Sequence, residues 1–118
     1  MKVHRTLGPG FLEAVYQKAL AHELRKMGFN VEEQKAIKVK YDGVIVGDYF
    51  ADLFVNDELI VEIKAVQSLA TGHELQTVNY LAATGQDHGL LLNFGSQSLE
   101  FKKKFREYRE PKPAEIKF

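Results

Sequence analysis

The stretch YFADLFVNDELIVEIKAV, residues 49–66, decides the fold. It predicts two strongly apolar β-strands joined by a short turn near Asn56. The second strand has apolar side chains on both of its sides, which is typical of a strand inside a sheet that is covered on both faces. Yet Asp52 interrupts the first strand, and Glu62 and Lys64 interrupt the second. These three charges lie in the most hydrophobic part of the chain and point to a site.

A helix is predicted before this stretch, over residues 10–28. Pro9 suits its first turn and Gly28 suits its C-terminal cap. Apolar residues recur every three or four positions and form one broad stripe. The stripe consists of Phe11, Leu12, Val15, Tyr16, Ala19, Leu20, Leu24 and Met27.

The rest of the chain predicts one mixed sheet between helices. Residues 29–55 alternate and turn at Asp42-Gly43, a strong hairpin signal. The further elements are a strand over 59–66, a helix over 71–85, a buried strand over 88–95, a strand or helix start over 98–105, and an irregular tail over 109–118. The order α-β-β-β-α-β predicts an α/β (α+β) fold with a mixed central β-sheet flanked by helices.

Composition limits the classes of protein. With 118 residues, of which 45% are apolar, we expect a single domain over residues 1–118. There is no Cys, which excludes disulfides and zinc–thiolate sites and fits a cytoplasmic protein. No apolar run approaches the roughly 20 residues of a membrane span, so no membrane partner is expected. The net charge is zero, so any role with nucleic acid must depend on a local site.

The placement of the three charges depends on the turn between the two strands. Glu62 and Lys64 are two residues apart and point the same way. With a three-residue loop over 56–58, Asp52 lies directly across from Glu62, whereas with a two-residue loop it faces away. The sequence leaves this alternative open.

A fourth charge, Glu13, falls on the margin of the apolar stripe, so we expect it to face inward. Together with Asp52, Glu62 and Lys64 it makes a partly buried site of charge −2, which is costly. Raised pKa values, greater exposure or a bound divalent cation would each relieve this cost. Oxygen ligands without Cys favour Mg²⁺, Mn²⁺ or Ca²⁺ over zinc.

The second predicted helix presents polar groups at a matching spacing. Gln76 and Tyr80 are four residues apart, and His73 is three before Gln76, so all three share a face.

These features together resemble the PD-(D/E)XK nuclease superfamily, which has a restriction-endonuclease-like core. The matching residues are Asp52, Glu62-Ile63-Lys64, Glu13 and Gln76 with Tyr80, the last two like the QxxxY motif of its RecB-like branch. The segments LGPGFLEAVYQKAL, YFADLFV, IVEIKAV and HELQTVNYLAATG resemble more closely the GxxExxxR / GxxExxY family. The resemblance extends from Val3 to Gly95, but Ala51 replaces the Pro of the superfamily name.

The resemblance implies a nuclease site that uses Mg²⁺ or Mn²⁺. Asp52, Glu62 and the Ile63 carbonyl would hold the metal, with Glu13 bound directly or through water. Lys64 would orient or activate the attacking water. Gln76 would position Lys64 or the water, and Tyr80 would support the site or contact a phosphate.

Two functions follow from the sequence. The first is a Mg²⁺-dependent nuclease acting on DNA or RNA. The second is a non-catalytic nucleic-acid or protein-binding module that retains the nuclease fold. Either would suit a homodimer, or a partner that completes the N-terminal helical layer. The basic run Lys102–Lys104 with Arg106 is either a solvated face or a contact for a nucleic-acid backbone.

Overall fold

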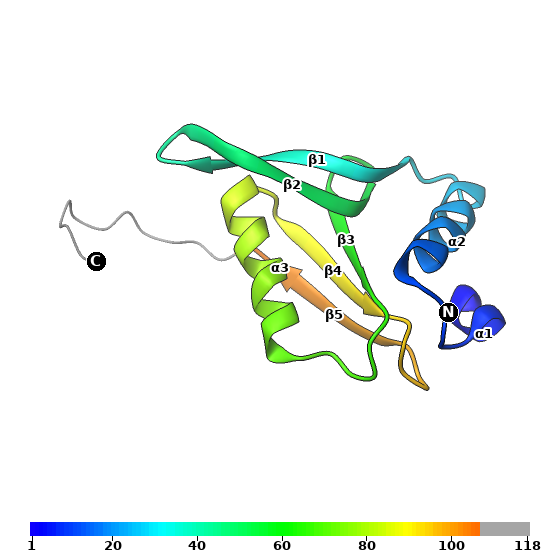
Figure 1. The fold of residues 1–118 in the computed structure, drawn as a ribbon. Coiled ribbons are helices and arrows are strands. Elements are labelled where there is room, and N and C mark those ends of the chain that lie inside the picture. The colour runs from blue at the N-terminus through cyan, green and yellow to red at the C-terminus, as the bar shows by residue number, and fades with distance from the viewer. Residues whose placement is uncertain (107–118) are drawn as a thin grey trace.

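The structure, a computed structural model, describes residues 1–106. Helices flank a five-stranded sheet of order β1-β2-β3-β4-β5 (Figure 1). The elements are α1 (Lys2–Leu7), α2 (Glu13–Lys26), β1 (Val31–Tyr41), β2 (Val44–Val55), β3 (Leu59–Lys64), α3 (Thr71–Thr84), β4 (His88–Asn93) and β5 (Glu100–Phe105). The predicted α+β class with a mixed sheet is confirmed. The predicted tail over 109–118 lies outside the described residues.

The two hairpins that carry the charges have short, defined turns. Asp42 and Gly43 connect β1 to β2 with positive φ angles of 51° and 75°, as the sequence predicted for this pair. Between β2 and β3, Val55 pairs with Leu59, so the loop is the three-residue one over 56–58. The pairs end at Leu53 with Val61, and the same register continued by one residue places Asp52 across from Glu62, as in the three-residue alternative of the sequence.

The sheet is mixed because β3 and β4 run parallel, with α3 as the crossover between them. β4 then pairs antiparallel with β5, so residues 100–105 form a strand and not the start of a helix. Asn93, fully buried at the end of β4, accepts hydrogen bonds at Oδ1 from the backbone N–H groups of Val66 and Gly95, each 3.0 Å long. Its Nδ2 donates to Glu100 at 2.9 Å.

Each face of the sheet has its own hydrophobic cluster. Val61 and Ile63 of β3 belong to the first cluster, which includes Tyr16 and Leu20 of α2. Ile60 belongs to the second cluster, which includes Leu81 of α3. The sheet is thus covered on both faces, and Glu62 and Lys64, which alternate with Ile63, lie on the α3 face.

The N-terminal region differs from the prediction. The main helix begins at Glu13 instead of residue 10, and a separate short helix, α1, precedes it. Gly8 and Gly10, with φ angles of 67° and 113°, turn the chain between the two helices, where Pro9 also lies. The Tyr16 hydroxyl stabilises this turn by donating to the Gly8 carbonyl at 2.6 Å.

The predicted apolar stripe is correct only in part. Tyr16 and Leu20 are buried, and Ala19 and Leu24 pack against the first cluster. Four members of the stripe are exposed: Phe11, Leu12, Val15 and Met27. Phe11 and Leu12 precede α2 and Met27 follows it, so the helical period does not apply to these three residues.

None of the helices in the described part of the chain is long and apolar enough to cross a membrane.

The ladder between β1 and β2 lacks one pair near the site, apart from a register shift between Val39 and Lys40 closer to the hairpin turn. Paired residues run from Val31 with Val55 to Val39 with Gly47, but Gln34 and Asp52, which would face each other, are not paired. The odd-numbered residues change sides across this gap. On the side of the gap near the start of β1, the odd-numbered residues belong to the first cluster (Val31, Leu53, Val55). On the side near the β1–β2 turn, they belong to the second cluster (Ile37, Val39, Tyr49, Ala51).

Candidate active site

Asp52 is held between β1 and β3. Its Oδ2 accepts a hydrogen bond of 2.7 Å from the backbone N–H of Ile63. Its Oδ1 accepts one of 3.1 Å from Nε2 of Gln34. The carboxylate is therefore fixed by one donor from each neighbouring strand.

Among the acids of the site, Glu62 has the pKa that is shifted most from its ordinary value. Burial raises its pKa from 4.5 to about 7, although the nearby Lys64 and the backbone N–H of Asp52 favour its charged form. The negative charge of Glu13 adds to the increase. Among the described residues, Oε1 of Glu62 is the one buried side-chain oxygen or nitrogen without a hydrogen-bond partner. Such a group is costly and marks a place for a proton donor or a cation.

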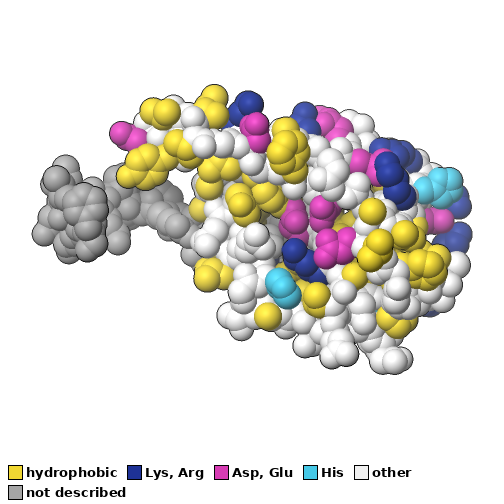
Figure 2. All heavy atoms as spheres, viewed as in Figure 1, with side chains coloured by type: hydrophobic (Ala, Val, Ile, Leu, Met, Phe, Trp, Pro, Cys, Tyr) yellow, Lys and Arg dark blue, Asp and Glu magenta, His cyan; other side chains and the backbone are white. Residues whose placement is uncertain are grey.

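A small pocket on the α3 face brings together Glu62, Lys64, Gln76 and Tyr80, whereas Asp52 and Glu13 are not among its lining residues. Its volume is about 50 Å³, and it is lined by Tyr49, Glu62, Lys64, Gln76, Thr77 and Tyr80. Figure 2 shows acidic side chains gathered beside a basic one in a hollow in the middle of this face. The Tyr80 ring stacks on Tyr49 with the centroids 4.1 Å apart. Tyr80 therefore forms a wall of the pocket.

Glu13 lies near the site but does not face inward as predicted. It is the first residue of α2, and its side chain is exposed. A carboxylate there is favoured by the positive end of the helix dipole. No three His, Asp or Glu side chains within residues 1–106 are placed to hold a metal ion together. Glu13 is thus not gathered with Asp52 and Glu62 into one three-carboxylate ligand set.

Other candidate residues have structural roles. Nδ1 of His73 accepts a hydrogen bond of 3.0 Å from the backbone N–H of Ala70 and caps α3. Lys104 forms an ion pair of 2.6 Å with Glu74, and Arg106 one of 2.8 Å with Asp87. These two members of the basic run have partners within the chain.

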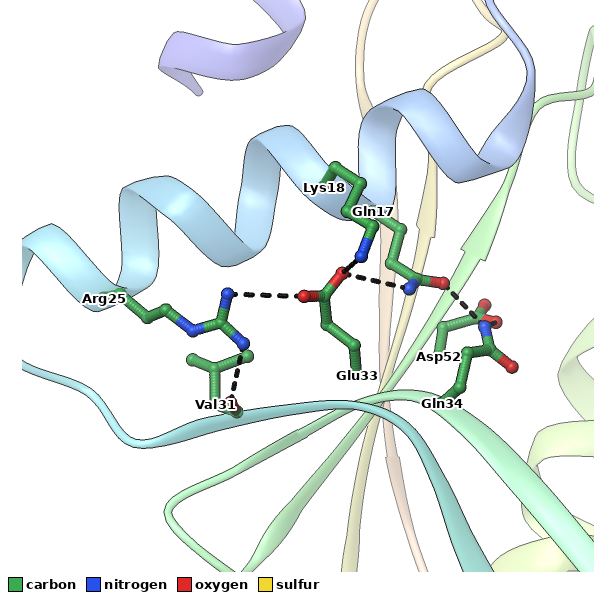
Figure 3. Close-up of polar contacts among 7 residues, drawn as sticks. All are labelled: Gln17, Lys18, Arg25, Val31, Glu33, Gln34 and Asp52. Atoms are coloured by element: carbon green, nitrogen blue, oxygen red, sulfur yellow. Dashed lines mark hydrogen bonds and ion pairs between the residues drawn. The ribbon is translucent and has the colours of Figure 1, made fainter.

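A polar network that the sequence did not predict lies behind Asp52 (Figure 3). It contains Gln17, Lys18, Arg25, Glu33 and Gln34. A β-bulge between Val39 and Lys40 shifts the β1–β2 register by one residue. Counting back from the turn without this bulge places Glu33, not Gln34, opposite Asp52. Only knowledge of the bulge would have identified Gln34.

The donor set of the site fits a hard divalent cation. Each oxygen of Asp52 accepts one protein hydrogen bond, so lone pairs remain on both. Glu62 adds an oxygen without a partner. Carboxylate oxygens of this kind suit Mg²⁺ or Mn²⁺.

Comparisons with known proteins bear on the family and on the fold. A family model described as the PD-(D/E)XK nuclease superfamily matches residues 1–106. The crystal structure of SSO0001 is similar to this fold, with a TM-score of 0.60 and 17% sequence identity. The similarity covers 81% of this chain and 52% of SSO0001, so this chain spans about half of that protein. At this identity the likeness shows the fold alone. No curated protein matches the sequence.

Proposed function

The chain belongs to the PD-(D/E)XK nuclease superfamily, and from this premise we propose that it is a Mg²⁺-dependent nuclease that hydrolyses phosphodiester bonds of DNA or RNA. Within the superfamily we place it in the GxxExxxR / GxxExxY family on its sequence motifs. One observation carries the proposal: Glu62, with a buried and unpartnered oxygen, shares a small pocket with Lys64.

Asp52, Glu62 and the Ile63 carbonyl are the groups that would hold the cation. When bound, Mg²⁺ or Mn²⁺ polarises a phosphoryl oxygen and lowers the pKa of a water molecule. The hydrogen bond from the Ile63 N–H to Asp52 contributes by fixing that carboxylate against β3. Glu13 is exposed at the start of α2, and we propose that it acts through water instead of as a direct ligand.

The remaining pocket residues act on the water and the phosphate. The Lys64 ammonium orients the attacking water and stabilises the negative charge that develops on the phosphate oxygens. Gln76 lines the same pocket and positions Lys64 or the water. Tyr80, held by its stacking on Tyr49, fixes the wall against which a phosphate would bind.

A second candidate function is a nucleic-acid or protein-binding module that retains the nuclease fold. One observation favours it: the described residues do not gather three carboxylates around one point. The two functions differ in whether a metal-dependent product forms.

Two substitutions test the nuclease. Lys64→Ala should lower the cleavage rate by about a hundredfold to a thousandfold, because one well-aimed contact to the transition state is lost. It should leave Mn²⁺ affinity intact or higher, since a neighbouring positive charge is removed. Glu62→Ala should lose both cleavage and Mn²⁺ binding. Cleavage of single- and double-stranded DNA and RNA, with Mg²⁺ or Mn²⁺ against EDTA, and Mn²⁺ calorimetry on the same samples measure these effects.

Lys40→Ala is the matched control, because Lys40 is exposed on β1 and does not line the pocket. It should cleave at close to the parent rate. If Lys64→Ala cleaves as fast as the parent, the mechanism is wrong. If no protein forms a metal-dependent product, the binding module is the better description.

A further inference from the structure

The backbone of Gln34 is strained in the middle of a strand. Its φ angle is 50°, in the left-handed region that residues other than Gly seldom adopt. The other non-Gly residues with positive φ in the described chain are Asp42, Asn56 and Asp57, and all three lie in the hairpin loops. Strain of this kind persists where the surrounding structure requires it, and it gathers at functional sites.

The strained residue lies opposite Asp52. The ladder between β1 and β2 omits this pair, and the sheet changes from one hydrophobic cluster to the other at the same point. The left-handed turn of Gln34 therefore has a structural effect, because it redirects the strand. It also brings the Gln34 amide to the Asp52 carboxylate.

The Gln34 amide connects Asp52 to helix α2 (Figure 3). Its Nε2 donates to Oε1 of the buried Gln17 at 2.6 Å and to Oδ1 of Asp52 at 3.1 Å. The Nε2 of Gln17 donates in turn to Glu33 at 3.3 Å. Both ends of this relay are carboxylates, which only accept when ionised, so the orientation of both amides is fixed.

The far end of the relay is anchored by charge. Glu33 forms ion pairs of 3.0 Å with Lys18 and 3.3 Å with Arg25. Burial opposes its ionisation, but the hydrogen bonds from Lys18, Gln17 and Arg25 outweigh burial and lower its pKa. The relay therefore begins at a group that stays negatively charged and does not rotate freely.

We propose that Gln34 is a positioning residue, which holds the Asp52 carboxylate in the orientation that binds the divalent cation. The proposal rests on the proposed function of the same site. Gln34 uses both hydrogens of its amide, one on Gln17 and one on Asp52, and so transmits the rigidity of the α2 network to the ligand. Asp52 keeps lone pairs free for the cation. Groups that orient a metal ligand typically contribute tenfold to a hundredfold to metal affinity.

The test compares Gln34→Gly, Gln34→Ala and the parent, each as the full chain. Gly removes the amide and relieves the strain, whereas Ala removes the amide and keeps the strain. Both should bind Mn²⁺ at least tenfold more weakly by calorimetry. In EDTA, Gln34→Gly should melt at or above the parent temperature and at a higher temperature than Gln34→Ala.

Asp42→Gly is the matched control, because Asp42 has nearly the same φ but lies in the β1–β2 turn. It should leave Mn²⁺ affinity unchanged. If Gln34→Gly binds Mn²⁺ as tightly as the parent, the role of Gln34 is confined to the backbone and the proposal is overturned. That outcome leaves the nuclease proposal intact, whereas a parent protein that binds no Mn²⁺ overturns both.

Discussion

At the scale of single residues, the site depends on the burial of one acid beside one base. Glu62 has an elevated pKa of about 7 because burial outweighs the favourable influence of Lys64. The folded protein therefore takes up a proton on Glu62 at a pH where the unfolded chain has already lost it. The ionised form is the one that would bind a cation. A bound cation would therefore offset the cost of burying the charged Glu62 carboxylate, which the protein without metal avoids by keeping the proton.

The pH dependence of stability follows from this pKa. Because the folded-state pKa lies above 4.5, Glu62 destabilises the fold as the pH rises from about 4.5 to about 7, and its effect is constant above that. At about 1.4 kcal/mol per pKa unit, the rise from 4.5 to about 7 corresponds to a loss of about 3.5 kcal/mol at most. Glu62→Gln should remove this contribution and be more stable than the parent at pH 8. Urea unfolding in EDTA at a series of pH values measures it.

Glu58→Gln provides the control, since Glu58 is exposed in the loop between β2 and β3. It should keep the pH dependence of the parent. Equal stability of Glu62→Gln and the parent at pH 8 would show that Glu62 is not penalised by burial.

The sequence predicted part of this site for clear physical reasons. Strand alternation fixes the relation of Glu62 to Lys64, and helix spacing fixes that of Gln76 to Tyr80. Asp52 could be placed only once the loop length was known. Glu13 was wrongly predicted to face inward, because its position as the first residue of α2 depends on the turn at Gly8 and Gly10.

At the scale of elements, the ends of β3 and β4 approach so closely that only Gly fits at position 95. A Cβ there would lie 2.5 Å from the backbone N and O of Val66. The same junction holds the buried Asn93, which bonds to both segments. The position of Lys64 at the end of β3 depends on this junction.

Gly95→Ala should therefore lower the free energy of unfolding by about 1 to 3 kcal/mol, the usual cost of overpacking. Gly47→Ala is the matched control, because Gly47 lies in β2 with open space around its Cβ position. Chemical unfolding of the two variants gives the comparison. An equal effect of both substitutions would exclude the close approach as the cause.

The elements were predicted well where hydrophobic periodicity and turn chemistry agree. The Asp42-Gly43 hairpin and the helix that ends at Gly85, with its φ of 75°, are examples. The start of α2 and the bulge in β2, where Val46 is the extra residue, were not predicted, because both depend on contacts between distant segments. The Tyr16 hydroxyl bond to Gly8 is one such contact.

At the scale of the whole molecule, the site is assembled from parts that connect over different chain lengths. β1, β2 and β3 follow one another through loops of two and three residues. The pairing of β3 with β4 must instead close the chain over residues 65–87, which include α3. Asp52 and Glu62 belong to the local part, whereas Gln76 and Tyr80 enter the pocket with α3.

Because of this connectivity, the pocket can open while the strands that carry the two carboxylates stay folded. Within α3, only Thr77 and Leu81 are buried, so little surface holds the helix on the sheet. We expect α3 to open locally, and its backbone amides to exchange with solvent deuterium faster than those of β2 and β3. Hydrogen–deuterium exchange of the native protein, followed by mass spectrometry, measures the exchange rates of α3 and of the two strands. Exchange of α3 and β2 at the same rate would contradict the expectation. Each opening would remove Gln76 and Tyr80 while the two carboxylates stay in register, so a nucleic acid bound in the pocket should slow exchange most in α3.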